Sequence, residues 1–238
     1  MAQAIYPSGK PRSNYAARMY CEIAMEAYSN ALELHNKICQ GDFDWEYMCE
    51  RDMLEKEVVK TVVFSAMCIE AFLNDYAAAC LGDANFYDNF DRLSPLSKFE
   101  LITRFVLHTG IDKSKAYYYY VKKLIKQRDS FMHSKSHTVE CCAMSKIEWE
   151  AFHAHLLECD PDEPPLLDRT EIEADMTNGR DALKAIKTFA DFFDEHDTNV
   201  FAIQKLFSPN GTSCDLVRDQ KYRQLICTML GIKASGIQ

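Results

Sequence analysis

The chain is organised around the stretch KQRDSFMH, residues 126–133, which lies near the end of a helix predicted from Lys115 to Ser134. Arg128 supplies a planar, always-charged fork that suits phosphate oxygens. His133 is the side chain best able to give and take a proton near neutral pH. The stretch therefore predicts a site that handles phosphate groups.

The spacing of the arginine and the histidine sets a geometric condition on such a site. Five residues advance an α-helix by about 500°, so Arg128 and His133 project about 140° apart. Asp129 and His133 share one stripe of the helix, where the carboxylate can hold the imidazole or favour its charged form. Arg128 and His133 converge only if the helix frays near Ser134, or if a groove or a partner chain wraps around it.

Charge is distributed unevenly along the chain. The net charge is −9, from 36 acidic and 27 basic residues, so the overall field does not favour indiscriminate binding to nucleic acid. The segment from Lys113 to His137, however, has seven basic residues against Asp129 alone. A basic patch on an acidic body is typical of a protein that binds anions at one place. A solvated lysine face is the alternative interpretation.

Composition indicates a soluble, helical, cytoplasmic protein. Of the 238 residues, 47% are apolar and 26% charged, and only 8 are glycine and 7 proline, which favours long helices with few tight turns. None of the ten cysteines forms a C-x-x-C pair, so we expect reduced, buried thiols. The first residues lack the features of a signal peptide. The most apolar run, Val58 to Leu81, is interrupted by charged residues, and we expect no membrane span.

Hydrophobic periodicity predicts an all-α protein, an up-and-down bundle forming a single domain over residues 1–238. Four tyrosines at 117–120 must point all around their helix, so some are core and some exposed. The expected elements are a helix at about 13–40, a long helix from about Trp45 closed by Gly82, a loop at 83–93, a helix from Pro95 to near Gly110 with Ser94 as N-cap, the 115–134 helix with Asp112 as its cap, an acidic loop at 160–175, a helix starting at Gly179, and a C-terminal helix at about 213–230.

Glu70 and Asn74 lie one turn apart on the long, largely apolar second helix. A buried carboxylate requires a charged partner, and Arg128 is the candidate for Glu70. A position at the edge of the surface is the alternative for this glutamate.

The order of these parts resembles the HEPN superfamily, a group of small α-helical bundles found in toxins, abortive-infection proteins and RNA-processing systems. The R-x4-6-H signature of that family, with a polar residue after the arginine, is matched by Arg128, Asp129 and His133. Glu70 and Asn74 resemble the E-A-x-x-N helix of several branches. The resemblance covers about residues 58–196, leaving the N-terminal and C-terminal helices as additions.

The resemblance implies a metal-independent endoribonuclease without a cofactor, whose active site forms where two motifs meet in a homodimer. Arg128 would bind the phosphate and His133 would transfer protons. Asp129 would position one of the phosphoryl oxygens, and Glu70 and Asn74 would support these residues. Phage defence, or a toxin restrained by an antitoxin or other protein partner, would be the corresponding biology. RNA would be bound by the lysines around the motif, Lys122, Lys123, Lys126 and Lys135.

Other functions stay open. Many HEPN proteins are non-catalytic, so a dimeric interaction or nucleotide-binding module is the main alternative. His153, His155 and Cys159, with Cys141 and Cys142 upstream, have ligand types suited to zinc, but their spacing matches no familiar site and we expect no metal. A cysteine nucleophile paired with a histidine is a further alternative, although no cysteine stands in a recognisable catalytic context.

Overall fold

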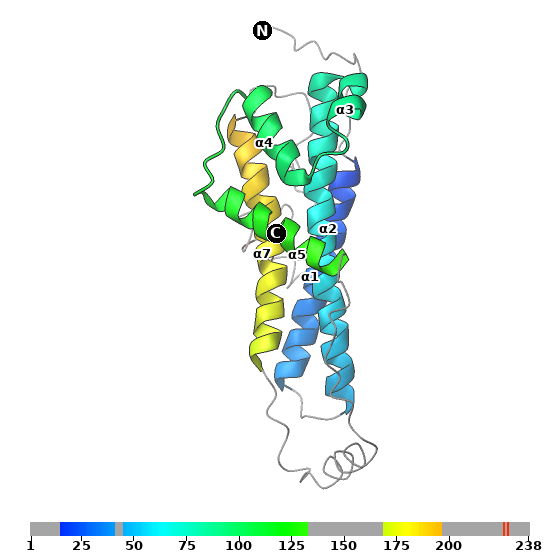
Figure 1. The fold of residues 1–238 in the computed structure, drawn as a ribbon. Helices are drawn as coiled ribbons and strands as arrows, with labels where there is room; N and C mark the ends of the chain where they lie inside the picture. The colour runs from blue at the N-terminus through cyan, green and yellow to red at the C-terminus, as the bar shows by residue number, and fades with distance from the viewer. Residues whose placement is uncertain (1–14, 41–44, 133–168, 197–225, 227, 229–238) are drawn as a thin grey trace, which may run out of the picture.

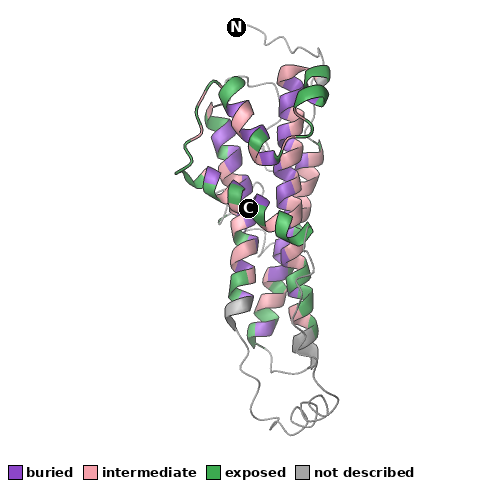
Figure 2. Cartoon of the chain, viewed as in Figure 1, coloured by how far each residue is buried: buried purple, intermediate pink, exposed green. Residues whose placement is uncertain are grey.

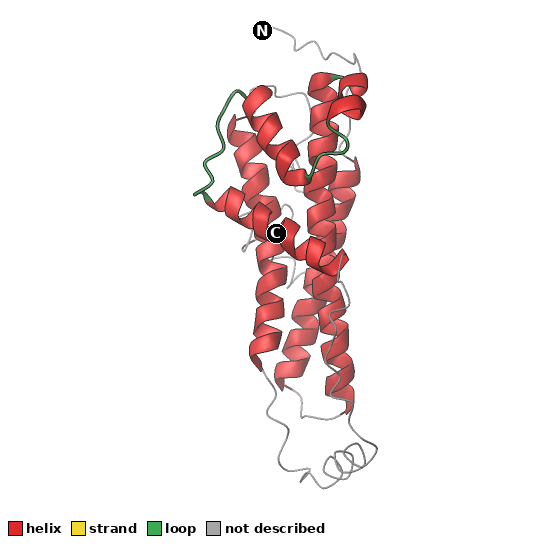
Figure 3. Ribbon diagram, in the orientation of Figure 1, coloured by secondary structure: helices red, strands yellow, loops and turns green. Residues whose placement is uncertain are grey.

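The computed structural model describes residues 15–40, 45–132, 169–196, 226 and 228. Within these residues the chain is helical and has no strand, as Figure 3 shows, so the predicted all-α class is confirmed. The described helices are α1 (Tyr15–Gln40), α2 (Trp45–Leu81), α3 (Asp83–Asn89), α4 (Pro95–Phe105), α5 (Ala116–Met132) and α7 (Arg169–His196).

Three long helices, α1, α2 and α7, lie side by side and form the length of the bundle, while α5 crosses α7 and α2 obliquely (Figure 1). Each long helix turns an apolar face inward, and one continuous core joins all six described helices (Figure 2). Small residues on the inner face of α1, such as Ala17, Cys21 and Ala24, are fully buried and allow the helix axes to approach closely. The N-terminal helix therefore belongs to the same core as the motif helix.

The second helix, α2, has a buried apolar stripe along most of its length. Val62, Ala66, Ile69, Leu73 and Tyr76 are each 0% exposed, whereas Val59 and Cys80 at its ends are half-buried. The segment Cys49–Leu81 is long and apolar enough to span a membrane, but 61% of its most apolar window is buried inside the protein. That burial is what a core helix of a soluble bundle requires.

The prediction that a helix starts at Gly179 is wrong, and so is the end of the predicted acidic loop, because α7 begins at Arg169. Gly179 lies inside the helix for a packing reason. A Cβ atom at this position would lie 2.9 Å from Cδ2 of the buried Tyr28 ring on α1. The glycine therefore lets α7 approach α1 at this level.

Two further boundaries differ from the prediction. The expected loop at 83–93 contains α3, a short helix anchored by burial of Phe86 and by a hydrogen bond from Asn85 Nδ2 to the Leu81 carbonyl. Helix α4 ends at Phe105 rather than near Gly110. His108 adopts a positive φ of 52°, which a continuing helix cannot accommodate.

The predicted start signal of α4 is confirmed, whereas Asp112 does not cap the next helix, because α5 begins at Ala116. Ser94 Oγ accepts a hydrogen bond from the Ser97 N–H, and Pro95 is the first residue of α4. Asp112 Oδ1 accepts hydrogen bonds from the Ser114 N–H and hydroxyl, and so organises the turn that precedes α5. The cap at Ser94 therefore fixes where α4 begins, and the turn at Asp112 leads the chain into α5.

Aromatic rings fill the part of the core that α4, α5 and α7 share. Phe99 of α4 is fully buried, with its ring centroid 5.2 Å from that of Phe189 and 5.4 Å from that of Phe192 on α7. The inward stripe of α7, which includes Leu183, Ile186 and Phe193, is also buried. The rings join α4 to α7 next to the motif helix.

The expected C-terminal helix lies outside the described residues except at positions 226 and 228, which are helical, with Ile226 fully buried. Most of the expected acidic loop is likewise outside them.

Truncating Phe99 tests this packing. We expect Phe99→Ala to lower the free energy of unfolding by about 3–5 kcal/mol, because it leaves a cavity among the rings. Phe105→Ala, on the same helix but 61% exposed, should change it by less than about 1 kcal/mol. Urea unfolding followed by circular dichroism measures both, and equal effects of the two substitutions would contradict the packing described.

Candidate functional site

The centre of the site is an ion pair between α5 and α2. Arg128 Nη1 lies 3.0 Å from Glu70 Oε2, and both side chains are half-buried. The predicted pairing of these two residues is confirmed. Arg128 Nε also donates to Asp129 Oδ1 at 2.9 Å. The guanidinium is therefore held by two carboxylates from different directions.

A second cation, which the sequence reasoning missed, lies beneath this pair. Lys98 of α4 is 1% exposed, and its Nζ donates to Asn74 Oδ1 at 2.8 Å. The same ammonium lies 3.8 Å from Glu70 Oε1 and 5.9 Å from the centroid of the Phe86 ring. A lysine on the face that carries Pro95 and Ile102 was the available signal, since a charge on a buried stripe requires partners.

These contacts join the predicted supporting residues into one group. Glu70, Asn74, Lys98, Arg128 and Asp129, here called the Arg128 cluster, come from α2, α4 and α5. The carboxylate of Glu70 is divided, with one oxygen toward each cation. Among the described residues, Arg128 donates hydrogen bonds from Nε and from Nη1.

The basic residues of α5 fall into two classes. Lys122 and Lys126 are exposed one turn apart, and Tyr119 and Asp129 continue the same stripe in either direction.

Lys123 instead points to α7, where its Nζ lies 2.7 Å from Asp181 Oδ2. Next to it, Gln127 Nε2 donates to Asn178 Oδ1 at 2.6 Å. Lys122 and Lys126 therefore face solvent, as residues of an RNA-binding surface must, whereas Lys123 is paired within the bundle.

His133 and Lys135 lie outside the described residues, the last described residue of α5 being Met132. The possible contact of Asp129 with the imidazole therefore also lies outside the described residues, while the Asp129 carboxylate accepts a hydrogen bond from Arg128 Nε. Of the tyrosines, Tyr118 is buried and Tyr119 is 58% exposed, which confirms that the run is divided between core and surface.

The alternative metal and cysteine sites fall partly outside the described residues. The histidines and cysteines at 141–159 lie outside the described residues, and within residues 15–40, 45–132 and 169–196 no group of three potential ligands gathers. One cysteine does meet a histidine: Cys39 Sγ lies 3.8 Å from His35 Nε2, which is 3.0 Å from Glu173 Oε1. Thiol and carboxylate approach the same ring nitrogen most closely, whereas nucleophilic catalysis needs them on opposite nitrogens.

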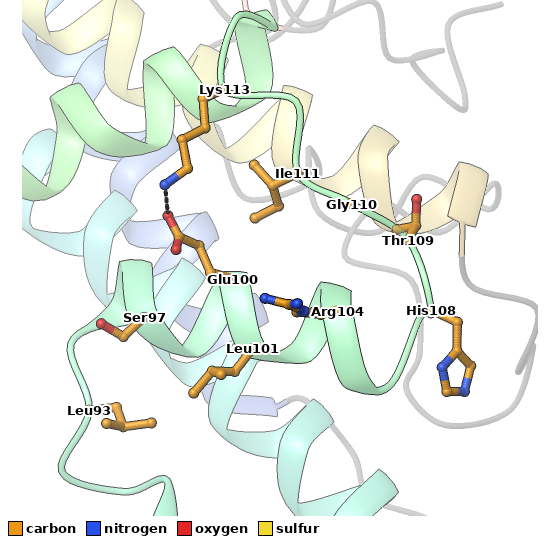
Figure 4. A pocket seen from close by; sticks show the side chains of 10 residues that line it. All are labelled: Leu93, Ser97, Glu100, Leu101, Arg104, His108, Thr109, Gly110, Ile111 and Lys113. Atoms are coloured by element: carbon orange, nitrogen blue, oxygen red, sulfur yellow. Dashed lines mark ion pairs between the residues drawn. The ribbon is translucent and has the colours of Figure 1, made fainter.

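A separate cavity of about 860 Å³ opens on the outer face of α4 (Figure 4). Lys113 Nζ lies 2.7 Å from Glu100 Oε1, which also accepts from the Tyr118 hydroxyl at 3.0 Å. The hydrogen bond from Lys113 lowers the pKa of the Glu100 carboxyl below its usual value. The lining residues are Leu93, Ser97, Glu100, Leu101, Arg104, His108, Thr109, Gly110, Ile111 and Lys113. None of them belongs to the Arg128 cluster, because Lys98 points from the opposite face of α4.

Comparison with known protein families, with curated proteins and with solved structures finds no match to this chain.

Removing the charge of Glu70 tests the cluster as a structural unit. Glu70→Gln leaves the buried Lys98 without a carboxylate, and we expect it to lower the free energy of unfolding by about 1–3 kcal/mol, less than for a fully buried pair because Glu70 is partly exposed.

The matched control is Glu33→Gln, since Glu33 pairs with Lys37 on the surface of α1 with both side chains about half exposed. Such pairs contribute less than about 1 kcal/mol. Urea unfolding curves of both variants give the comparison. Equal small losses would mean that Lys98 does not depend on Glu70.

Proposed function

We propose that the protein is a metal-independent, HEPN-type endoribonuclease, working in the cytoplasm as a homodimer in which two motifs face one cleft. The observation that carries the proposal is the fixed position of Arg128, whose fork is held by Glu70 and Asp129 at the end of α5. The exposed Lys122 and Lys126 lie on the same helix, where an RNA backbone could follow them toward the motif.

The reaction needs no external nucleophile. The ribose 2′-oxygen attacks the adjacent phosphorus while a base takes the hydroxyl proton, and the bond from phosphorus to the 5′-oxygen breaks as that oxygen receives a proton. The products are a 2′,3′-cyclic phosphate and a 5′-hydroxyl, and no metal is consumed or required. His133 is assigned the proton transfers, with the two protomers able to supply a base and an acid.

Arg128 is assigned the role of stabilising the negative charge that builds up on the phosphoryl oxygens in the transition state. A guanidinium already oriented by carboxylates needs little reorganisation when the transition state forms, which is how electrostatic catalysis gains its effect. Asp129, as the second partner of the fork, is assigned the orienting role. Glu70 and Asn74 support it from α2 through the Arg128 cluster.

A non-catalytic interaction or nucleotide-binding module is the second candidate. It is favoured by the pairing of Lys113, Lys123 and Arg128 with carboxylates, which leaves the basic segment less positive than its sequence indicates. Under either function a toxin or phage-defence role, with an antitoxin or another protein as regulator, is part of the proposal.

Cleavage of RNA in EDTA separates the two candidates. We expect the wild-type protein to leave cyclic phosphate ends, and His133→Ala to be slower by about 10²–10⁴-fold, as for loss of a general acid or base. Arg128→Ala should be slower by about 10²–10³-fold because it removes an oriented charge. Denaturing gels with end-group analysis by mass spectrometry measure both.

Two exposed residues of α4 and its following turn serve as controls, His108→Ala and Arg104→Ala, which should retain wild-type rates because neither belongs to the Arg128 cluster. A wild-type protein that is inert under the conditions of the assay, or a cleavage activity that all four variants share, argues for the non-catalytic module.

Charge reversal on α5 tests the RNA surface. Lys122→Glu with Lys126→Glu should weaken RNA binding and reduce the salt dependence of log K by about one unit for each phosphate that the protein no longer neutralises. Lys56→Glu, at an exposed position of α2, is the control and should leave both unchanged. Fluorescence anisotropy at several salt concentrations measures the RNA affinity of each variant and its salt dependence. An identical slope in the two variants would place the RNA elsewhere.

A further inference from the structure

Lys98 is the most deeply buried charged group among the described residues, at 1% exposure. An ammonium group without water costs several kcal/mol unless it is paired and hydrogen-bonded. Its surroundings provide an amide oxygen from Asn74, a carboxylate oxygen from Glu70 and the face of the Phe86 ring. Packing alone does not require a lysine here, because an apolar side chain of the same length would fill the same space.

The ammonium determines how Glu70 meets Arg128. Oε1 of Glu70 is turned toward Lys98 and Oε2 toward Arg128, so the carboxylate is shared between two cations. Without Lys98, the full charge of Glu70 would act on Arg128 alone. The guanidinium would then be bound more strongly by the protein and less available to a ligand.

Charge balance gives the same result. Lys98 and Arg128 face Glu70 and Asp129, so the formal charge of these four side chains is zero. Loss of the Lys98 charge would leave a net negative group at the place where a phosphate must arrive. Because the site is half-buried, that charge is screened less than one on the open surface.

We propose that Lys98 is a positioning residue for phosphodiester binding: by sharing Glu70, it keeps Arg128 electrostatically available to the backbone of an RNA. Lys98 does not itself touch the ligand, since its side chain is buried between α4 and α2. The role assigned to Lys98 rests on the proposed function, because it assumes that Arg128 meets an RNA phosphate.

Binding of an RNA that cannot be cleaved tests this role apart from catalysis. The probe is a fluorescein-labelled oligonucleotide with 2′-O-methyl riboses, which lacks the attacking hydroxyl. We expect Lys98→Met to weaken its binding by about tenfold, from one uncompensated charge close to the phosphate. Arg128→Ala should weaken it at least as much.

The double variant Lys98→Met with Glu70→Gln separates charge from structure. It removes one charge of each sign and restores the balance of the cluster, so we expect RNA affinity to return to within about threefold of wild type. A structural role alone predicts no recovery, because the double variant departs further from the native side chains than either single variant. Urea unfolding identifies which variants are folded, and affinities are compared only among those.

The outcomes distinguish the two proposals. If Arg128→Ala binds the probe as tightly as wild type, the proposed function fails and the role of Lys98 fails with it. If Arg128→Ala binds weakly but folded Lys98→Met binds like wild type, or if the double variant shows no recovery, only the role of Lys98 is overturned. Should Lys98→Met itself not fold, the folded double variant decides: an affinity near wild type supports the role, and a loss of about tenfold or more contradicts it.

Discussion

The carboxylate of Glu70 lies between two cations, and much of the described structure near the motif depends on that arrangement. Lys98 approaches one oxygen from α4 and Arg128 the other from α5, so a single side chain of α2 joins three helices. Neither Lys98 nor Glu70 can be removed alone without leaving a buried or half-buried charge uncompensated. The helices are thereby fixed in the relative positions that bring Arg128 next to Glu70.

The rest of the bundle supplies a rigid support for this group. On its other side α5 is tied to α7 by the Lys123–Asp181 ion pair and by the amide contact between Gln127 and Asn178. The aromatic rings around Phe99 and Phe189 hold α4 against α7. An arginine presented from an element braced on two sides keeps its direction, which a phosphate-binding group requires to act without reorganisation.

Some of this arrangement could be predicted from sequence and some could not. The partner of Glu70 was predictable because a carboxylate on an apolar helix needs a cation. Lys98 was missed because periodicity treats lysines as exposed, although its spacing from Pro95 and Ile102 places it on the inner face of α4. Gly179 was taken as a helix start, whereas its role is close packing against Tyr28, a contact between residues far apart in sequence.

The basic segment also depends on contacts between residues far apart in sequence, which the sequence alone does not reveal. Counting charges between Lys113 and His137 predicts a strongly positive surface, but the count cannot see that Lys123 pairs with Asp181 or Lys113 with Glu100. Those acidic partners come from other helices. Periodicity does predict the exposed stripe on α5, since Lys122 and Lys126 follow helical spacing.

The central claim, that a phosphate of RNA meets the fork of Arg128, is tested most directly by nuclear magnetic resonance. The measurement follows the side-chain Nε–Hε signal of Arg128 in ¹⁵N-labelled protein, assigned by its loss in Arg128→Lys, during titration with the uncleavable RNA. The account predicts a hydrogen-bonded signal in the free protein, from the contact with Asp129, that shifts in step with binding while the signal of Arg104 stays in place. Saturation of the protein with RNA while the Arg128 signal remains unchanged would contradict it.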